Sequence, residues 1–247
     1  MRVSIVIAVL DSHEILRRQM LHWEKLNLPD DVEILLVDDG SDPPLSIPEG
    51  CGLKNIRIHA TNDFRPWTQP IARNTGVKLA RGEYVICTDI DHILTRKLID
   101  EVLNTKDDVV QFKRQVGILD ERGDFDQRIE TMKAWGFPQE RIEHRGLKIV
   151  PHGNSYAMRR ELFLKYGGGR EDRITTYPNQ EEVPLRGKIR RDARRGNITI
   201  AEHRPTIYMF PVGRYIGGLD ANPFGLFHSL SRIEYLNEFK RGGGVQA

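Results

Sequence analysis

Two carboxylates at the end of an apolar run offer the clearest chemistry in this sequence. Asp89 and Asp91, one residue apart, follow the apolar stretch 84–88. Oxygen ligands suit Mg²⁺ and Mn²⁺, and these cations also bind phosphate oxygens. Alternate side chains of an extended segment point the same way, so both carboxylates can face one ion or, by chance, solvent. The pattern predicts that Asp89 and Asp91 hold a divalent cation and a diphosphate.

Alternating strand and helix patterns indicate the elements that position these carboxylates. Short apolar runs predict strands at 3–9, 32–37, 55–60, 84–88 and 109–117. Helical spacing and caps predict helices at 13–26, 71–80, 96–104, 160–166 and 181–195. Such alternation predicts an α/β fold with a doubly wound parallel sheet, whose ligands bind beyond the carboxyl ends of the strands. Asp38 and Asp39 lie at such an end, as Asp89 does.

The composition favours an ordinary folded protein of one globular unit. The chain has 247 residues, of which 39% are hydrophobic and 29% charged, and only two cysteines, Cys51 and Cys87. These two residues provide neither a disulfide framework nor a cysteine metal finger. A signal peptide is not recognisable, and no apolar stretch reaches the roughly 18 residues of a membrane span. We therefore expect a cytoplasmic protein without a transmembrane segment, and the sequence leaves its oligomeric state open.

Charge is distributed unevenly along the chain. Residues 1–110 carry 13 Lys and Arg against 18 Asp and Glu, whereas residues 111–247 carry 24 against 17. The densest basic stretch contains Arg186, Lys188, Arg190, Arg191, Arg194 and Arg195. These residues suit the phosphates of a donor or an anionic acceptor, or else form a solvated helix face.

Several motifs, in their order along the chain, resemble glycosyltransferase family 2 and its relatives with the GT-A fold. They are VEILLVDDGS at 32–41, ARNTG at 72–76 and GEYVICTDID at 82–91, and the likeness resumes at 159–161, 167–169 and 181–182. The resemblance implies a Rossmann-like, mostly parallel central sheet flanked by helices, with an α+β extension on the acceptor side. It also implies a metal-dependent, hexosyltransferase-type enzyme that moves a sugar from a nucleoside diphosphate sugar to a hydroxyl group.

The same resemblance assigns parts of the chain to donor and acceptor. Residues 1–110 are expected to bind the nucleotide sugar, for which a UDP-sugar with Mn²⁺ or Mg²⁺ is favoured. Residues 111–241 are expected to bind the acceptor and supply a catalytic base within the same domain, and 242–247 to form a flexible tail. The segment 151–155 is expected to be a small-residue loop lining the site.

Roles for single residues also follow from the resemblance. The residues expected to bind the donor are Ala8, Leu10, Asp38, Asp39, Arg73 and Asp89. Asp39 is expected to bind the base, Arg73 the base or phosphates, and Asp89 both ribose and metal. The alternatives are turn formation or helix capping for Asp38 and Asp39, and a surface ion pair for Arg73.

Histidines offer further metal ligands beside Asp89 and Asp91. His92 either ligates the cation, binds the donor or serves as a polar loop residue. Among His152, His203 and His228, we select His228 as the late metal ligand. Trp67 and Trp135 either stack on rings of the substrates or anchor loops.

An enzyme that inverts the anomeric centre needs a base for the acceptor hydroxyl, and Glu182 is our candidate. It is the second residue of an acidic pair that begins the helix expected at 181–195, a position where the family commonly has Asp. The alternative is an acidic helix start that offsets the helix dipole. The sequence also leaves open a retaining outcome.

Three other functions compete with transfer to a carbohydrate. The basic second half, with the segment 226–232, also suits a phage-like enzyme that glycosylates a hydroxylated base in DNA. A nucleotide-binding but inactive homologue is a further alternative. A phosphate-accepting receiver domain is disfavoured, because the acidic pair follows the second strand and the chain is far too long.

Overall fold

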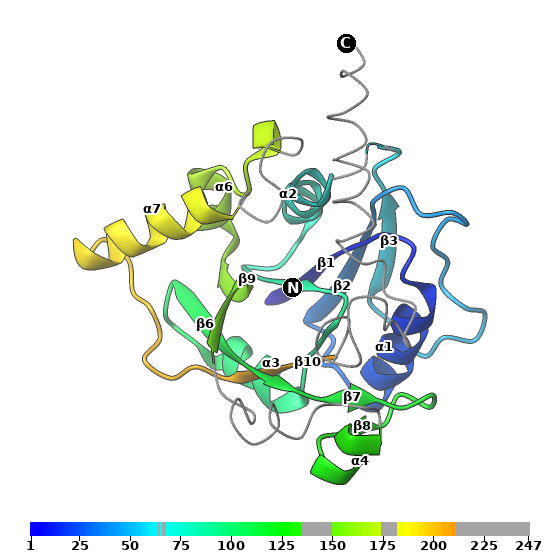
Figure 1. Ribbon diagram of the computed structural model, residues 1–247. Helices are drawn as coiled ribbons and strands as arrows, with labels where there is room; N and C mark the ends of the chain where they lie inside the picture. The colour runs from blue at the N-terminus through cyan, green and yellow to red at the C-terminus, as the bar shows by residue number, and fades with distance from the viewer. Residues whose placement is uncertain (64, 66–67, 135–149, 174–181, 211–247) are drawn as a thin grey trace, which may run out of the picture.

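An eight-stranded sheet runs through the protein and separates two layers of helices (Figure 1). The computed structural model describes residues 1–63, 65, 68–134, 150–173 and 182–210. The strands of this sheet are β1 (Val3–Val9), β2 (Val32–Asp38), β3 (Ile56–Ala60), β4 (Tyr84–Asp89), β5 (His92–Ile93), β6 (Val109–Val116), β9 (Val150–Arg159) and β10 (Thr206–Met209). Their order is β3-β2-β1-β4-β9-β6-β10-β5.

The first half of the sheet is parallel because its strands are linked by crossover connections. β1 pairs with β2 and β4, and β2 pairs with β3, all in parallel. β1 and β2 are almost continuous runs of buried aliphatic residues, as expected for strands covered on both faces. The strands predicted at 3–9, 32–37, 55–60, 84–88 and 109–117 are confirmed to within about one residue at each end.

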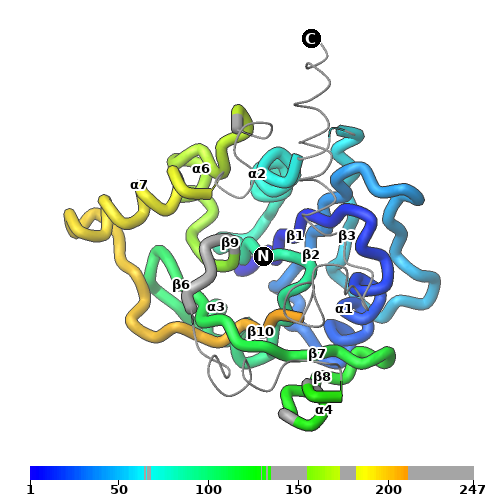
Figure 2. Tube along the Cα trace, in the orientation of Figure 1, coloured from blue at the N-terminus to red at the C-terminus, as the bar shows by residue number. Residues whose placement is uncertain are grey.

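Helices cover both faces of the sheet (Figures 1 and 2). They are α1 (His13–Lys25), α2 (Gln69–Leu79), α3 (Arg96–Asn104), α4 (Ile129–Ala134), α6 (Arg160–Tyr166) and α7 (Val183–Arg194). Apolar residues of α1 and α3 share one buried cluster with the sheet, and those of α2, α6 and α7 share the other. The expected α/β class, with helices flanking the sheet, is confirmed. Of the helices that the structure describes, none has the length and apolarity required to cross a bilayer.

β9 differs from the sequence expectation. The expected loop at 151–155 is wrong, because these residues belong to a strand that pairs antiparallel with both β4 and β6. Pro151 and Gly153 disfavour a strand locally, but the pairing on both sides overrides that preference. Pro151 lies beside the irregularity where the register with β6 shifts between Gln111 and Lys113, a place where a proline is tolerated.

Shorter elements complete the described part of the second half of the chain. β7 (Ile118–Leu119) and β8 (Phe125–Asp126) form a small antiparallel pair before α4. β10 pairs in parallel with β6 and antiparallel with β5. Neither β5 nor β10 was predicted from the sequence, since strands of two to four residues carry too little periodicity to be recognised.

Helix α2 packs so closely on the sheet that one glycine has no room for a side chain. A Cβ atom at Gly76 would overlap Val6 Cγ1 and lie 2.8 Å from Val37 Cγ2. Gly76→Ala is expected to lower the free energy of unfolding by about 1–3 kcal/mol through this overpacking. Chemical denaturation of both proteins measures the difference.

Gly187 in α7 provides a matched control. A Cβ atom there would meet nothing within 4 Å. Gly187→Ala should therefore raise the free energy of unfolding by up to about 1 kcal/mol, since alanine favours the helix. A loss of similar size in both variants would contradict the close packing at Gly76.

Candidate active site

The carboxyl ends of β1, β2 and β4 meet at one edge of the sheet. In the strand register, Val9 lies opposite Asp38 and Ala8 lies opposite Asp89. Leu10 follows β1 directly and, like Ala8, is half-buried. The topology thus brings Ala8, Asp38 and Asp89 to one edge, which is where ligands bind in open α/β sheets.

A buried arginine joins two parts of the site that are far apart in sequence. Arg73 of α2 donates from Nη2 to Asp89 Oδ1 and from Nη1 to Glu182 Oε1, each at 2.7 Å. The side chains of Arg73 and Glu182 are 1% and 3% exposed. Burial lowers the pKa of Arg73, but the charges of Glu182 and Asp89 more than offset this and raise it. Arg73 therefore forms ion pairs, as one expectation had it, but buried rather than surface ones.

Asp91 and His92 form a cluster with Asp89 that suits a metal ion. One ligand atom from each of the three residues lies within 4.8 Å of the others. His92 Nδ1 is 3.2 Å from Asp91 Oδ1 and 3.8 Å from Asp89 Oδ2. Asp89 Oδ1 accepts hydrogen bonds from Arg73 and Gln69, so Oδ2 is the oxygen on the side of the cluster. The structure thus brings the two predicted carboxylates together with a histidine.

The three histidines considered as further metal ligands, His152, His203 and His228, lie in different parts of the chain. His203 is 70% exposed, and its Nε2 lies 3.0 Å from Glu101 Oε2 on α3. His152 belongs to β9. His228, the ligand selected from the sequence, lies outside the described residues, as do Trp67 and Trp135.

Helix α1 supports the turn that carries Asp91. Gln19 Nε2 donates to the backbone carbonyls of Ile90 and His92, each at 2.9 Å. His22 Nε2 lies 2.9 Å from the carbonyl of Leu94, and burial lowers the pKa of this histidine, which favours the neutral ring. The sequence analysis does not identify Gln19 or His22. The sequence does carry one indication of their role, because both are polar residues on the apolar stripe of an amphipathic helix.

Asp38 and Asp39 are both buried, but they contact different parts of the site. Asp38 accepts hydrogen bonds from the backbone N–H groups of Ser41 and Leu45, at 2.8 and 2.9 Å. Both of its oxygens therefore stabilise the loop that follows β2. This is the turn-forming role given above as an alternative to donor binding. Asp39 Oδ1 accepts a hydrogen bond of 2.5 Å from Thr68 Oγ1, next to α2.

Glu182 directly precedes α7 and lies in a buried, mostly neutral setting. The Tyr156 hydroxyl donates to Glu182 Oε2 across 3.4 Å, a long hydrogen bond. Burial, and then the charge of Glu182, raise the pKa of Tyr156 well above its usual value. Burial likewise raises the pKa of Cys87 to about 12. Arg73 is therefore the charged partner of Glu182, while Tyr156 is a neutral donor that sequence analysis did not find.

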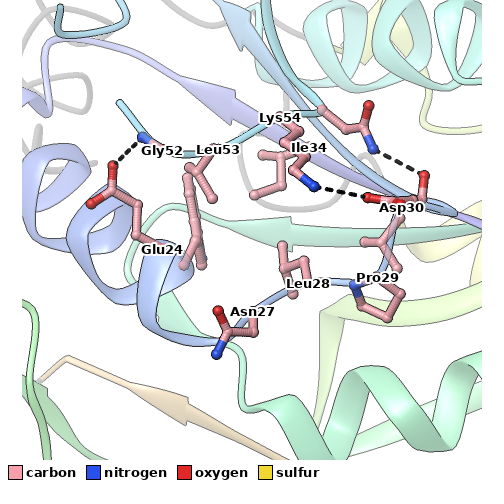
Figure 3. Close-up of a pocket in the computed structure, with 12 residues that line it drawn as sticks. Glu24, Asn27, Leu28, Pro29, Asp30, Ile34, Gly52, Leu53 and Lys54 are labelled. Carbon is pink, nitrogen blue, oxygen red and sulfur yellow. Dashed lines mark hydrogen bonds and ion pairs between the residues drawn. The ribbon is translucent and has the colours of Figure 1, made fainter. Parts of the chain in front are cut away.

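A separate cavity of about 290 Å³ lies at the amino end of β2, the opposite edge of the sheet (Figure 3). Gly52 N donates to Glu24 Oε1 at 2.8 Å on one side of it, and Asn55 Nδ2 donates to the carbonyl of Asp30 at 2.9 Å on the other. None of the predicted site residues that the structure describes lines this cavity, so it is separate from the candidate active site.

The arrangement thus combines a metal-ligand cluster and a carboxylate at one edge of the sheet. Asp89 connects the two, because its Oδ1 pairs with Arg73 and its Oδ2 lies toward His92 in the metal-ligand cluster. A cation here would neutralise a diphosphate, and a carboxylate beside it would accept a proton. Both functions suit group transfer from a nucleotide to a hydroxyl group.

Comparisons with known proteins agree with this geometry. A family model described as Glycosyl transferase family 2 matches residues 4–167. Glycosyltransferase GlyG of Streptococcus pneumoniae serotype 4 (strain ATCC BAA-334 / TIGR4) is 27% identical over 99 residues, which cover 40% of this chain and 33% of that protein. The chain therefore matches only about a third of the length of this curated relative.

Solved structures share the fold. S. aureus TarS 1-349 in complex with UDP has a TM-score of 0.53 and 15% identity, over 87% of this chain and 61% of that chain. Mannosyltransferase PcManGT from Pyrobaculum calidifontis, in complex with GDP-Man and Mn2+, has a TM-score of 0.51 and 17% identity, over 84% and 56%. This chain thus spans about three fifths of each structure. These likenesses show the GT-A fold that the sequence predicted.

The ion pairs of Arg73 generate a stability prediction. Arg73→Met would leave Asp89 and Glu182 without their shared counterion, and Glu182 is deeply buried. Breaking a buried pair in this way is expected to cost about 3–5 kcal/mol of the free energy of unfolding. Denaturant titration measures this loss.

Arg159 is a matched control, because it also pairs with two carboxylates. It contacts Glu83 Oε1 at 2.5 Å and Asp108 Oδ1 at 3.0 Å, but its side chain is 28% exposed. Arg159→Met should cost about 1 kcal/mol or less. Equal losses in the two variants would show that burial does not set the strength of the Arg73 pairs.

Proposed function

The chain belongs to glycosyl transferase family 2, and from this we propose that it moves a sugar from a nucleoside diphosphate sugar to a hydroxyl acceptor with a divalent cation bound at Asp89, Asp91 and His92. The observation that carries the proposal is the buried Asp89–Arg73–Glu182 arrangement beside this metal-ligand cluster. It joins a diphosphate site to a carboxylate that can accept a proton.

The donor is proposed to lie across the carboxyl ends of β1, β2 and β4. Carboxylate oxygens with one imidazole nitrogen suit Mn²⁺ or Mg²⁺, with Mn²⁺ more tolerant of the nitrogen. When bound, the cation would neutralise charge on the departing diphosphate. UDP in TarS and GDP-Man with Mn2+ in PcManGT support a nucleotide donor of this class, and we favour a UDP-sugar.

Residues of the second half would then act on the acceptor. In the proposed inverting reaction, the acceptor oxygen bonds to the anomeric carbon, the bond to the diphosphate breaks, and the acceptor proton moves to Glu182. Arg73 donates to Glu182 Oε1 and so holds the side chain of the proposed base in place. Glu182 Oε2 is the oxygen suited to the task, since its contact with Tyr156 is long. We therefore assign residues 1–110 to the donor and 111–241 to the acceptor and base.

Nucleotide binding tests the donor site. Thermal unfolding in the presence of UDP, GDP, CDP or ADP, with and without Mn²⁺, should show a metal-dependent rise in Tm with one nucleotide, because a ligand of the folded state stabilises it. Asp91→Asn should abolish the rise.

Asp30→Asn is the control, since Asp30 lies at the opposite edge and its side chain is 86% exposed. This variant should keep the full metal-dependent rise. No rise with any nucleotide in the unaltered protein would overturn the donor site, whereas a rise without sugar transfer would favour the inactive-homologue alternative.

The base is tested by Glu182→Gln. The amide keeps the shape of the side chain but cannot accept the acceptor proton, so the rate of sugar transfer should fall about 10²–10⁴-fold. Release of nucleoside diphosphate from the donor identified above measures the rate. The metal-dependent rise in Tm should persist, and an unchanged rate would exclude Glu182 as the base.

A further inference from the structure

A groove of about 590 Å³ lies between α7 and the sheet, beside the proposed base. Its lining residues come from α7, from β6 and β9, and from the segment that leads to β10. In the view of Figure 1, this segment leaves α7 and passes below β6 on its way to β10. We call it the α7 groove, and its charged lining residues are Arg186, Arg190, Arg194, Glu202 and Arg204.

The positive charges of the α7 groove form a row that starts at Glu182. Arg186, Arg190 and Arg194 follow Glu182 at intervals of four residues, so they lie along one face of the helix. A helix rises about 1.5 Å per residue, which places successive arginines about 6 Å apart along the axis. The row therefore leads outward from the proposed base for about three helical turns.

These guanidinium groups are available to a ligand. Among the described residues, no ion pair joins a carboxylate to Arg186, Arg190, Arg194 or Arg204, although Glu202 lines the same groove. Arg190 and Arg194 are exposed, and Arg186 and Arg204 are half-buried. Arg194 donates from Nε to the carbonyl of Arg190 at 3.3 Å, a bond that does not involve its two terminal nitrogens. Lys188 donates its ammonium group to the carbonyl of Tyr166 and does not line the groove.

Tyr156 links the α7 groove to the proposed base, although Glu182 is not itself among the lining residues. Tyr156 lines the groove, and its hydroxyl contacts Glu182 Oε2. The remaining lining is largely aliphatic, with Ile189 and Ile200 among its members. Among the lining residues that the structure describes, Tyr156 is the one aromatic residue and is only 5% exposed, so none of them offers an open aromatic face for stacking on nucleic-acid bases.

We propose that the α7 groove binds the acceptor, and that the acceptor is an anionic carbohydrate chain bearing phosphate or carboxylate groups. Arginine suits both groups, because its planar guanidinium donates two parallel hydrogen bonds to either. The end of such a chain would lie at Glu182, and its anionic groups would lie along the arginines. This inference rests on the proposed function for the identity of the reacting end.

Binding to defined polymers tests the groove without any nucleotide. The probes are dextran, dextran phosphate, oligogalacturonate and single-stranded DNA, with fluorescence anisotropy as the measurement. At least one anionic glycan should bind at least about tenfold more tightly than dextran and more tightly than the DNA. Its affinity should fall with added salt, and comparing dextran phosphate with oligogalacturonate shows which anionic group is preferred.

Two charge-matched double variants locate the site. Arg190→Glu with Arg194→Glu reverses two charges of the groove and should weaken glycan binding at least about tenfold, by like-charge repulsion. Arg191→Glu with Arg195→Glu makes the same change in net charge on residues that do not line the groove, and should change affinity by less than about threefold. Equal losses in the two double variants would overturn the proposal.

Other outcomes separate this inference from the proposed function. Dextran binding as tightly as both anionic glycans, or DNA binding more tightly than both, would overturn the acceptor class even if the nucleotide-dependent rise in Tm is seen. A missing rise in Tm would instead overturn the donor site, and glycan binding that depends on Arg190 and Arg194 would then show an anion site without a transferase.

Discussion

The active edge of the sheet depends on one guanidinium group that is enclosed by two carboxylates. Arg73 comes from α2, Asp89 from the end of β4 and Glu182 from the start of α7, so a single side chain fixes the relative positions of three elements. Taking such charges out of water is costly, and the enclosure persists only because each charge has a hydrogen-bonded partner. The pairs therefore act as a geometric constraint, because they hold Asp89 and Glu182 at a set distance from each other.

Backbone groups impose a second constraint on the same edge. Gln19 binds the carbonyls on either side of Asp91, and Asp38 binds two N–H groups of its own loop. In both cases a buried polar side chain satisfies backbone groups that lie outside regular strand pairing. The turns that carry candidate ligands are therefore held by the protein itself, and Asp91 and His92 keep their positions relative to Asp89 without help from a ligand.

The sequence was sufficient to predict elements that local apolar patterns determine. It was not sufficient for elements and contacts that depend on segments far apart in the chain. The apolar runs of β1, β2 and β4 were sufficient to place Asp89 at the correct edge. The Thr95 side chain, which accepts from Leu98 N, marked the start of α3. β9 was not predicted because it is a strand through its pairing with β4 and β6, which lie far away in the sequence. The pairing of Arg73 with Glu182, 109 residues later, and the neutral contact from Tyr156 could not be read from spacing either. Gln19 was detectable in principle, as a polar residue on an apolar helical stripe.

The helical phase of α7 has a consequence for how this protein can vary. Each residue added to a helix turns everything beyond it by about 100°. One residue inserted between Glu182 and Arg186 would leave the carboxylate on Arg73 but would rotate all three arginines out of the groove. Substitutions at positions 186, 190 and 194 keep these side chains on the same face of α7, so they can change the charge of the groove. The number of residues between positions 182 and 186, by contrast, must stay constant.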